Sequence, residues 1–436
     1  MKEPSGVTGE MVPPTRGSED ALPGPPLHVL PCFAGFFLAV RTVTVLLAVR
    51  LFGAEPELGA AANVGFELLL LTVVGFCTFG DRRQPGTPVR QLLAGRWVLL
   101  FLGFSACSLL WSSSVSVTNS TAYWCALAAD VAMVTLLLRA GPFSDTTDSL
   151  LQGFVWGACA VAFVAWILPA QPDLRLGDEE LLGPNSIGYL CGLAFFFAQY
   201  LMRESGRRPT LAAIFLAVTV LRTLSKTTIV AFVFSQGFLL VCDRSITRKT
   251  KILTVLLALG VLAAFSGLLA SYYDVYTNAG SQSETLTGRL GIWAYFLAEA
   301  WRQPWIGHGF DSAWKVIPPF GSDQFQAPHA HNEMLQQFYA YGAVGIVLFC
   351  GLYGSFFVQI RRMFAGPQRT WLFALLVFVL VRGTADTERF DLSLPLWGVV
   401  LFSRLAEENR CRQAIPLHGS RTTVRSRSTV SEGLVG

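Results

Sequence analysis

A pair of histidines is the first candidate for catalytic chemistry in this sequence. His329-x-His331 is followed by Asn332 and Glu333, and a long apolar run starts directly after them. His331 therefore falls at, or just before, the first turn of a predicted helix, where the positive end of the helix dipole disfavours imidazolium. A neutral imidazole can take a proton from a hydroxyl group. The position allows a general base at His331, and it equally allows a capping or interfacial histidine without catalysis.

A metal site is the other possibility for these histidines. His329 and His331 could bind a metal ion together with His308 and Glu333. Short His-x-His pairs are common without metal, so we expect no metal and no cofactor. The nine cysteines include no Cys-x-x-Cys pair, which argues against a disulfide framework or a thiolate metal site.

Four cations next to apolar segments fall on the predicted outer side of the membrane: Arg222, Lys226, Arg289 and Arg382. Cations on that side run against the positive-inside rule, so a compensating anion is a natural reason for them. A diphosphate suits the planar fork of an arginine. Arg382 could instead pair with Asp386 or Asp391.

Composition indicates where these residues are held. Of 436 residues, 52% are hydrophobic and 14% charged, and the mean hydropathy is +0.48. A soluble domain carries about 25% charged residues. These values exclude a soluble enzyme, a disordered protein and a nucleic-acid-binding module, and they predict an all-α polytopic membrane bundle.

Twelve apolar stretches can serve as transmembrane helices. With the N-terminus in the cytoplasm, most of the 33 Lys and Arg residues fall on the cytoplasmic side, which predicts that both termini are cytoplasmic. The spans 209–223 and 226–242, on either side of the turn 222–226, are short, so Arg222 and Lys226 in that turn would lie within the outer leaflet. The predicted spans are 30–52, 60–79, 96–112, 122–139, 150–170, 184–202, 209–223, 226–242, 251–271, 334–359, 369–385 and 392–406.

The predicted organisation is a membrane domain, 28–408, between two disordered cytoplasmic tails, 1–27 and a basic tail, 409–436. A long external loop, 272–333, separates the ninth and tenth spans and holds three of the five histidines. Within it, residues 286–301 repeat apolar side chains at helical spacing, which predicts an amphipathic helix on the membrane surface or over the bundle.

Four stretches of the sequence form motifs. They are His331-Asn332 followed after nine residues by Gly342-Ala-Val-Gly345; Gly288-Arg289 with Trp293 and Pro304-Trp-Ile-Gly-His-Gly309; Leu224-Ser-Lys-Thr-Thr228; and Gly183-Pro-Asn185. Their arrangement resembles that of bacterial O-antigen ligases and related polysaccharide polymerases, with Lys226 in the place of an arginine. The resemblance covers roughly residues 95–405, and it includes the twelve-span layout with the long external loop.

The resemblance implies a function and roles for the residues. The family transfers glycans from an undecaprenyl-diphosphate carrier to an acceptor hydroxyl at the outer face of the cytoplasmic membrane, without a metal. His331 would be the base and Arg289 a diphosphate ligand that also stabilises the leaving group. Lys226, alone or together with Arg222, would be the second diphosphate cation. Attack opposite the leaving diphosphate would invert the anomeric centre.

Partners and alternatives follow from the same resemblance. The expected partners are a lipid-linked glycan donor, a glycan, lipid or protein acceptor, and the bilayer, with no nucleic acid. The sequence does not separate a ligase of lipopolysaccharide biosynthesis from a polymerase of exopolysaccharide biosynthesis. A transporter is the main alternative, for which Arg41, Glu67 and Asp130 are the candidate ionisable residues in the middle of spans. A non-catalytic scaffold of envelope assembly is the third hypothesis.

Overall fold

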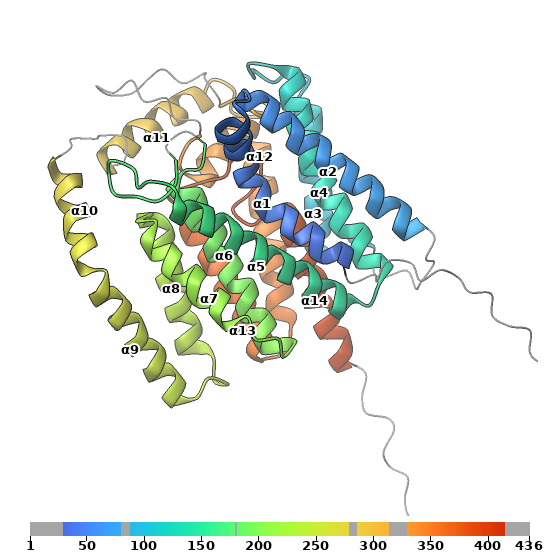
Figure 1. The fold of residues 1–436 in the computed structure, drawn as a ribbon. Coiled ribbons are helices and arrows are strands. Elements are labelled where there is room, and N and C mark those ends of the chain that lie inside the picture. Colours follow the sequence, from blue (N-terminus) through green and yellow to red (C-terminus); the bar gives the residue numbers. More distant parts are fainter. Residues whose placement is uncertain (1–28, 80–87, 179–180, 279–285, 314–328, 415–436) are drawn as a thin grey trace, which may run out of the picture.

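The computed structural model describes residues 29–79, 88–178, 181–278, 286–313 and 329–414. These residues are α-helical throughout and contain no β-strand, only one isolated bridge between Asp178 and Leu182. The elements, shown in Figure 1, are α1 (Val29–Phe52), α2 (Pro56–Phe79), η1 (Val89–Gln91), α3 (Leu93–Ser108), α4 (Val117–Ala140), α5 (Phe143–Ile167), α6 (Pro184–Glu204), α7 (Thr210–Arg222), α8 (Lys226–Cys242), α9 (Arg248–Ala264), α10 (Ser266–Asn278), α11 (Leu286–Ala300), α12 (Glu333–Arg362), α13 (Pro367–Gly383) and α14 (Leu396–Ala414).

Each of the twelve predicted spans contains a helix, and the predicted amphipathic segment is α11. Five helices, α1, α2, α4, α5 and α12, are long and apolar enough to cross a membrane. The ninth predicted span is broken into α9 and α10, which bend by 50° and would form a sixth crossing together. Twelve crossings therefore remain a prediction, and α14 extends past the predicted domain end at 408.

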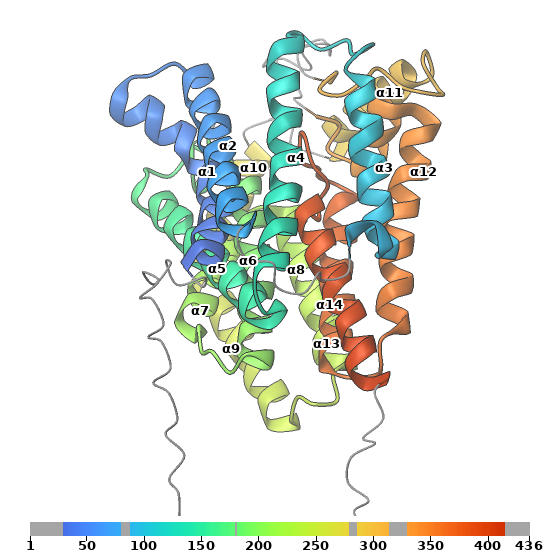
Figure 2. The ribbon, with the colours of Figure 1, turned by 90° about the vertical axis from the view of Figure 1, so that its right-hand side faces the viewer.

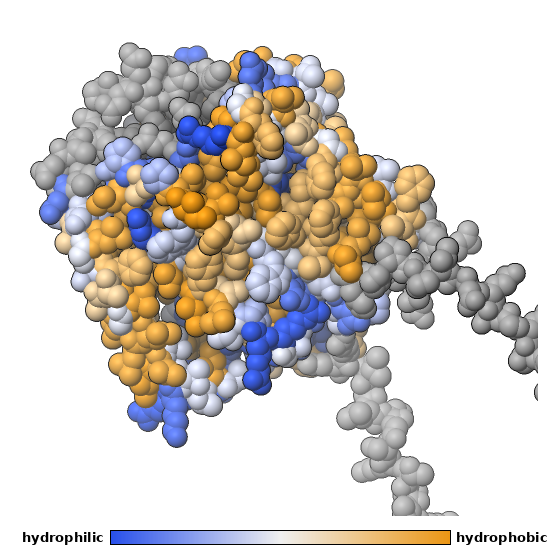
Figure 3. All heavy atoms as spheres, viewed as in Figure 1, coloured by the Kyte–Doolittle hydropathy of each residue, from blue (hydrophilic) through white to orange (hydrophobic). Residues whose placement is uncertain are grey.

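The outer surface of the bundle is suited to lipid. The face shown in Figure 3 is broadly hydrophobic across its middle, with hydrophilic residues towards its upper and lower edges. Helix α9 is the clearest case, because none of its residues is buried while Leu253, Leu256 and Leu259 are more than half exposed. A helix that buries no apolar residue in protein needs a lipid environment, so the bilayer completes its packing.

The charged residues within the first helices are paired with one another. Arg41 on α1 lies 2.6 Å from Asp130 on α4 and 3.5 Å from Glu67 on α2. Both carboxylates are almost fully buried, which is tolerable because a guanidinium faces them. The three residues that could have marked a transport path thus tie α1, α2 and α4 together.

A kink in α12 anchors the loop that precedes it. Gly342 has φ 62°, so the helix is interrupted there and frees backbone groups. Segment 304–309 fills the interruption: His308 N–H donates to Tyr339 O at 3.0 Å, and Ala343 N–H donates to Pro304 O at 2.7 Å. A Cβ on Gly342 would overlap the backbone of Trp305. The glycines of the sequence motif therefore lock the loop against α12.

This anchoring places α11 and the start of α12 at one edge of the bundle. Both lie at the upper edge in Figures 1 and 2, whereas α14 ends at the lower edge. The start of α8 and the connection from α13 to α14 also reach this region, since Arg289 on α11 donates to the Thr227 hydroxyl and to the backbone carbonyl of Ala385. The predicted site residues are therefore carried by four separate parts of the chain.

Candidate active site

A tight turn before α12 presents His331. Its φ of 49° is in the left-handed region that a non-glycine residue rarely adopts, which costs about 1–3 kcal/mol. The backbone N–H of His331 donates to Nδ1 of His329 at 3.2 Å. Asn332 is the N-cap of α12, because its Oδ1 accepts from Leu335 N–H at 2.9 Å. The predicted position of His331 immediately before the first helical turn is confirmed.

Asn332 also connects the turn to the end of α13. Its Nδ2 donates to Thr384 O at 2.9 Å. The next residue, Glu333, is buried, and its Oε1 accepts from Ser393 N–H at 2.6 Å. The histidine turn is thus fixed to both ends of the segment between α13 and α14.

That segment brings a carboxylate to His331. Oδ1 of Asp386 lies 3.4 Å from Nδ1 of His331, and Oδ2 of the same residue lies 3.2 Å from Nη2 of Arg382. Burial disfavours the charged form of Asp386, but Arg382 and the two histidines outweigh burial and hold the pKa of the carboxyl well below its usual range. An ionised carboxylate at Nδ1 favours the tautomer in which Nε2 is the basic nitrogen.

His329 is suited to support rather than to proton transfer. Burial lowers its pKa to about 3, and His331, Arg382 and Arg389 act in the same direction. Its Nδ1 already accepts the His331 N–H, which a protonated Nδ1 could not do. A neutral His329 therefore holds the strained backbone of His331 in place.

Arg382 differs from its predicted role as a diphosphate ligand. It is only 1% exposed, and its Nη2 contacts Asp386 and, at 2.8 Å, Glu388. Its guanidinium also lies 4.1 Å from the centre of the Tyr189 ring. The pairing with Asp386 considered from the sequence is confirmed. With its charge shared by two carboxylates, Arg382 is placed to hold Asp386 and not to bind a substrate anion.

Arg289 connects the segment between α13 and α14 with the start of α8. Its Nη1 donates to Ala385 O at 2.6 Å and to Thr227 Oγ1 at 3.1 Å. Ala385 directly precedes Asp386, and Thr227 directly follows Lys226. The half-buried guanidinium of Arg289 thus lies between the neighbour of Asp386, which contacts His331, and the neighbour of Lys226.

The structure separates Arg222 from Lys226. Helix α7 ends at Arg222 and α8 begins at Lys226, with Leu224 between them at φ 55°. The turn predicted at 222–226, between two short helices, is therefore present. Arg222 donates to Leu174 O at 2.7 Å and lies over Trp166, on the side of the loop between α5 and α6. Lys226 is exposed, with Nζ 5.4 Å from the centre of the Tyr272 ring.

The Pro-Asn motif has a structural role in this turn. Oδ1 of Asn185, at the start of α6, accepts from Ser225 Oγ and from Arg175 Nη2, both at 2.8 Å. Ser225 is fully buried and immediately precedes Lys226. Asn185 therefore fixes the start of α8, which sets where Lys226 emerges.

Metal binding can be judged from the same geometry. Among the described residues, ligand atoms of His329, His331 and Asp386 lie within 4.8 Å of one another. The predicted alternative set does not form: His308 stacks on Tyr339 with ring centres 4.4 Å apart, and Glu333 accepts from Ser393. Asp386 already shares its charge with Arg382, whose positive charge beside the cluster disfavours a cation.

The chain is similar in sequence to known proteins. The profile of a family described as O-antigen ligase matches residues 211–350, which hold α8, Arg289 and the His331 turn. The exopolysaccharide production protein ExoQ of Rhizobium meliloti (strain 1021) is 24% identical over 325 residues, covering 67% of this chain and 72% of the relative. The O-antigen ligase of Pseudomonas aeruginosa (strain PAO1) is 25% identical over 314 residues, covering 69% and 74%.

These matches support the O-antigen ligase superfamily for this chain and a membrane enzyme of the glycosyltransferase type, as the motif resemblance predicted. The chain departs from the pattern expected for that superfamily in carrying Lys226 where an arginine was expected. Sequence reasoning also missed Asp386 as a partner of His331, although the signal was present as a carboxylate three residues after the end of α13.

Proposed function

We propose that this protein transfers a glycan from an undecaprenyl-diphosphate carrier to an acceptor hydroxyl at the outer face of the bacterial cytoplasmic membrane. The observation that carries the proposal is the convergence at Asp386. This carboxylate is 3.4 Å from His331, and the neighbouring Ala385 carbonyl accepts from Arg289. The proposed base, His331, and the proposed cation, Arg289, thus contact two adjacent residues, Asp386 and Ala385, of the segment between α13 and α14.

In the proposed reaction, Nε2 of His331 removes the proton of the acceptor hydroxyl as its oxygen attacks the anomeric carbon. The bond from that carbon to the diphosphate oxygen breaks, and its electron pair leaves with the undecaprenyl diphosphate. Asp386 stabilises the imidazolium that forms at His331. Attack from the face opposite the leaving group inverts the anomeric centre.

The diphosphate would lie between Arg289 and Lys226. Arg289 is already positioned by Thr227 and Ala385, so it needs little reorganisation to meet the negative charge that develops on the leaving group. Arg222 points away towards Leu174, and we therefore assign the second cation to Lys226. Both chain termini would lie in the cytoplasm, with α11 on the outer side.

The direct test is a reconstituted transfer assay. Purified wild type and His331→Ala would receive lipid-diphosphate-linked oligosaccharide and candidate acceptors, and release of undecaprenyl diphosphate would be measured with the length of the product. We expect release by the wild type and at least about a hundredfold less by the variant, which is typical of a lost general base. A ladder of products would indicate a polymerase, and a single addition a ligase. Equal release by both proteins would refute the assigned base.

A further inference from the structure

An apolar groove lies between α1 and α5, and none of the proposed site residues lines it. It has a volume of about 530 Å³, and the connection from α6 to α7 contributes Arg207 to its lining. Phe33 and Trp156 are about half exposed, so the groove opens at the surface of the bundle. The other lining residues are Val29, Cys32 and Phe36 from α1, and Ser149, Gln152 and Gly153 from α5.

The close approach of α1 and α5 shapes this groove. A Cβ on Gly153 would overlap the carbonyl of Cys32, and a Cβ on Gly35 would overlap the carbonyl of Leu150. Small residues of this kind let two helix backbones meet within a membrane. The aromatic side chains next to the contact have no room between the helices, so they stand beside it and form the walls of the groove.

Arg207 lies at one end of the groove. It is close enough to Cys32 and to Asp148 for its charge to act on both, and Asp148 directly precedes Ser149. Trp156 comes seven residues after Ser149 in the sequence, which is roughly 10 Å further along the helix. The groove therefore has a cationic end beside Ser149 and an apolar end at Trp156.

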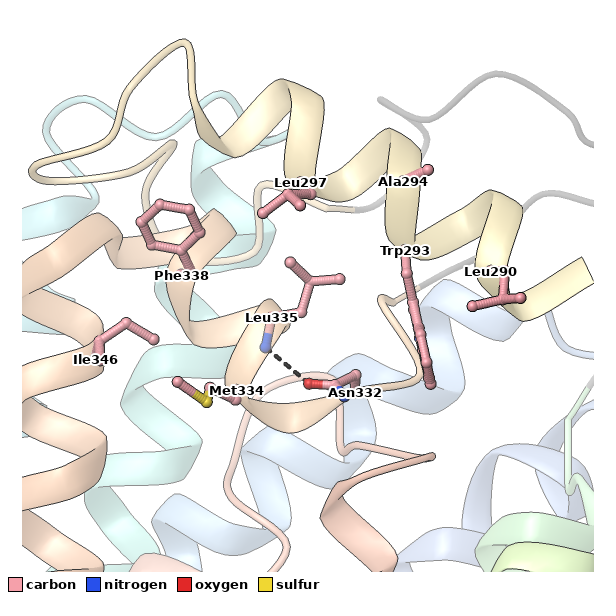
Figure 4. Close-up of a pocket in the computed structure, with 9 residues that line it drawn as sticks. All are labelled: Leu290, Trp293, Ala294, Leu297, Asn332, Met334, Leu335, Phe338 and Ile346. Atoms are coloured by element: carbon pink, nitrogen blue, oxygen red, sulfur yellow. Dashed lines mark hydrogen bonds between the residues drawn. The ribbon is translucent and has the colours of Figure 1, made fainter. Parts of the chain in front are cut away.

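The polar side chains of the lining are available to a ligand. Among the described residues, neither the Arg207 guanidinium nor the Gln152 amide makes a hydrogen bond or an ion pair, and the lining contains no carboxylate. The groove between α11 and α12, shown in Figure 4, is different. No charged residue lines it, and Oδ1 of its Asn332 already accepts from Leu335 N–H. The groove between α1 and α5 thus suits a negative group that carries an apolar chain.

We propose that this groove binds an anionic phospholipid, with the phosphate at Arg207 and one acyl chain running towards Trp156. An acyl chain in the bilayer is already out of water, so selectivity comes from the head group. A guanidinium binds a phosphate well, and the ammonium of a zwitterionic lipid would offset part of that attraction.

The proposed topology gives the source of this lipid. The starts of α1 and α5 and the connection from α6 to α7 would all lie on the cytoplasmic side, so the lipid would come from the inner leaflet. A bound lipid would connect these three parts of the chain. The inference is independent of the proposed transfer reaction, because no residue of the groove takes part in it.

Two adjacent arginines provide a matched pair of variants. Arg208 follows Arg207 in the same connection, but it is exposed and does not line the groove. Arg207→Gln removes the charge from the groove, and Arg208→Gln removes the same charge next to it. Neither arginine makes a hydrogen bond with a described residue, so both variants should fold.

Photo-crosslinking identifies the lipid in the groove. The full chain is reconstituted in vesicles of equal parts phosphatidylglycerol and phosphatidylethanolamine, with a photo-reactive residue in place of Trp156. The same residue in place of Phe163, which is exposed on α5 outside the lining, reports bulk lipid. We expect phosphatidylglycerol to be labelled about fivefold more than phosphatidylethanolamine at position 156, and both lipids equally at position 163.

The arginine variants then test the cationic end. Arg207→Gln should abolish the excess of phosphatidylglycerol at position 156, and Arg208→Gln should retain it. Equal labelling of the two lipids at position 156 would assign the groove to bulk lipid and overturn the proposal. Equal losses in both arginine variants, or crosslinks to residues 1–28 in place of lipid, would overturn it as well. Because the readout is labelling, the result holds whether or not the protein transfers a glycan.

Discussion

Replacing Asp386 by asparagine tests the contact on which the proposed mechanism depends. The substitution keeps the size of the side chain and removes its charge. The amide can no longer stabilise an imidazolium at His331, and its NH₂ group can donate to Nδ1 and so favour the opposite tautomer. We therefore expect Asp386→Asn to lower kcat while the protein remains folded.

The size of the effect follows from the distance. Two unit charges 3.4 Å apart interact by about 5 kcal/mol at an effective dielectric constant near 20. Arg382 lies 3.2 Å from the other carboxylate oxygen and opposes part of this stabilisation. A net loss of about 2–4 kcal/mol in the transition state corresponds to a kcat lower by about 30- to 900-fold.

The assay is release of undecaprenyl diphosphate at saturating donor, with Glu388→Gln as the matched control. Glu388 is the second carboxylate on Arg382 and makes no described contact with His331. Its substitution should therefore lower kcat much less than Asp386→Asn does. A kcat for Asp386→Asn within about threefold of the wild type, less than 1 kcal/mol, would refute the role given to this contact.

Further predictions concern the cations, the turn, the kink and metal. Lys226→Ala should raise the KM for donor by about tenfold or more and Arg222→Ala should not, since loss of a charge-assisted phosphate contact costs about 1.5–3 kcal/mol. The pKa of His329 is lowered from 6.5 to about 3 in the folded protein, so between these pH values His329 is protonated only in the unfolded chain. The contribution of His329 to the stability of the fold is therefore complete above pH 6.5 and falls as the pH drops towards 3. His329→Asn, which keeps an acceptor for the His331 N–H, should flatten the decline in melting temperature over that range. Gly342→Ala should destabilise the fold by at least about 1–2 kcal/mol, seen as a lower melting temperature, because a Cβ is strained at positive φ and overlaps Trp305. Treatment with a chelator should leave transfer unchanged, and loss of activity restored by a divalent ion would instead favour a metal at the His329 cluster.

The sequence pattern was sufficient to predict those features that depend on residues close together in the chain. The helical ranges could be predicted because each apolar run indicates a helix by its own length and composition. His331 could be placed before a helix because Asn332 and an apolar run directly follow it. The break between α9 and α10 was not predictable, since the apolar run continues through it. The turn at 222–226 was predicted from the two short apolar runs beside it, but the left-handed conformation of Leu224 within that turn was not.

Composition and motif order in the sequence were sufficient to predict an α-helical membrane enzyme related to O-antigen ligases, and they supplied the proposed base and most of the proposed cations of the site. The tertiary structure decided which of these residues meet. Asp386 reaches His331 only because α13 ends beside the start of α12, where Asn332 bonds to Thr384. Arg382 is drawn into the bundle by two carboxylates and Tyr189, although in the sequence it looks the same as the cations that remain accessible. Pairings of this kind depend on burial and distance between segments far apart in the chain, and neither quantity is encoded in local pattern.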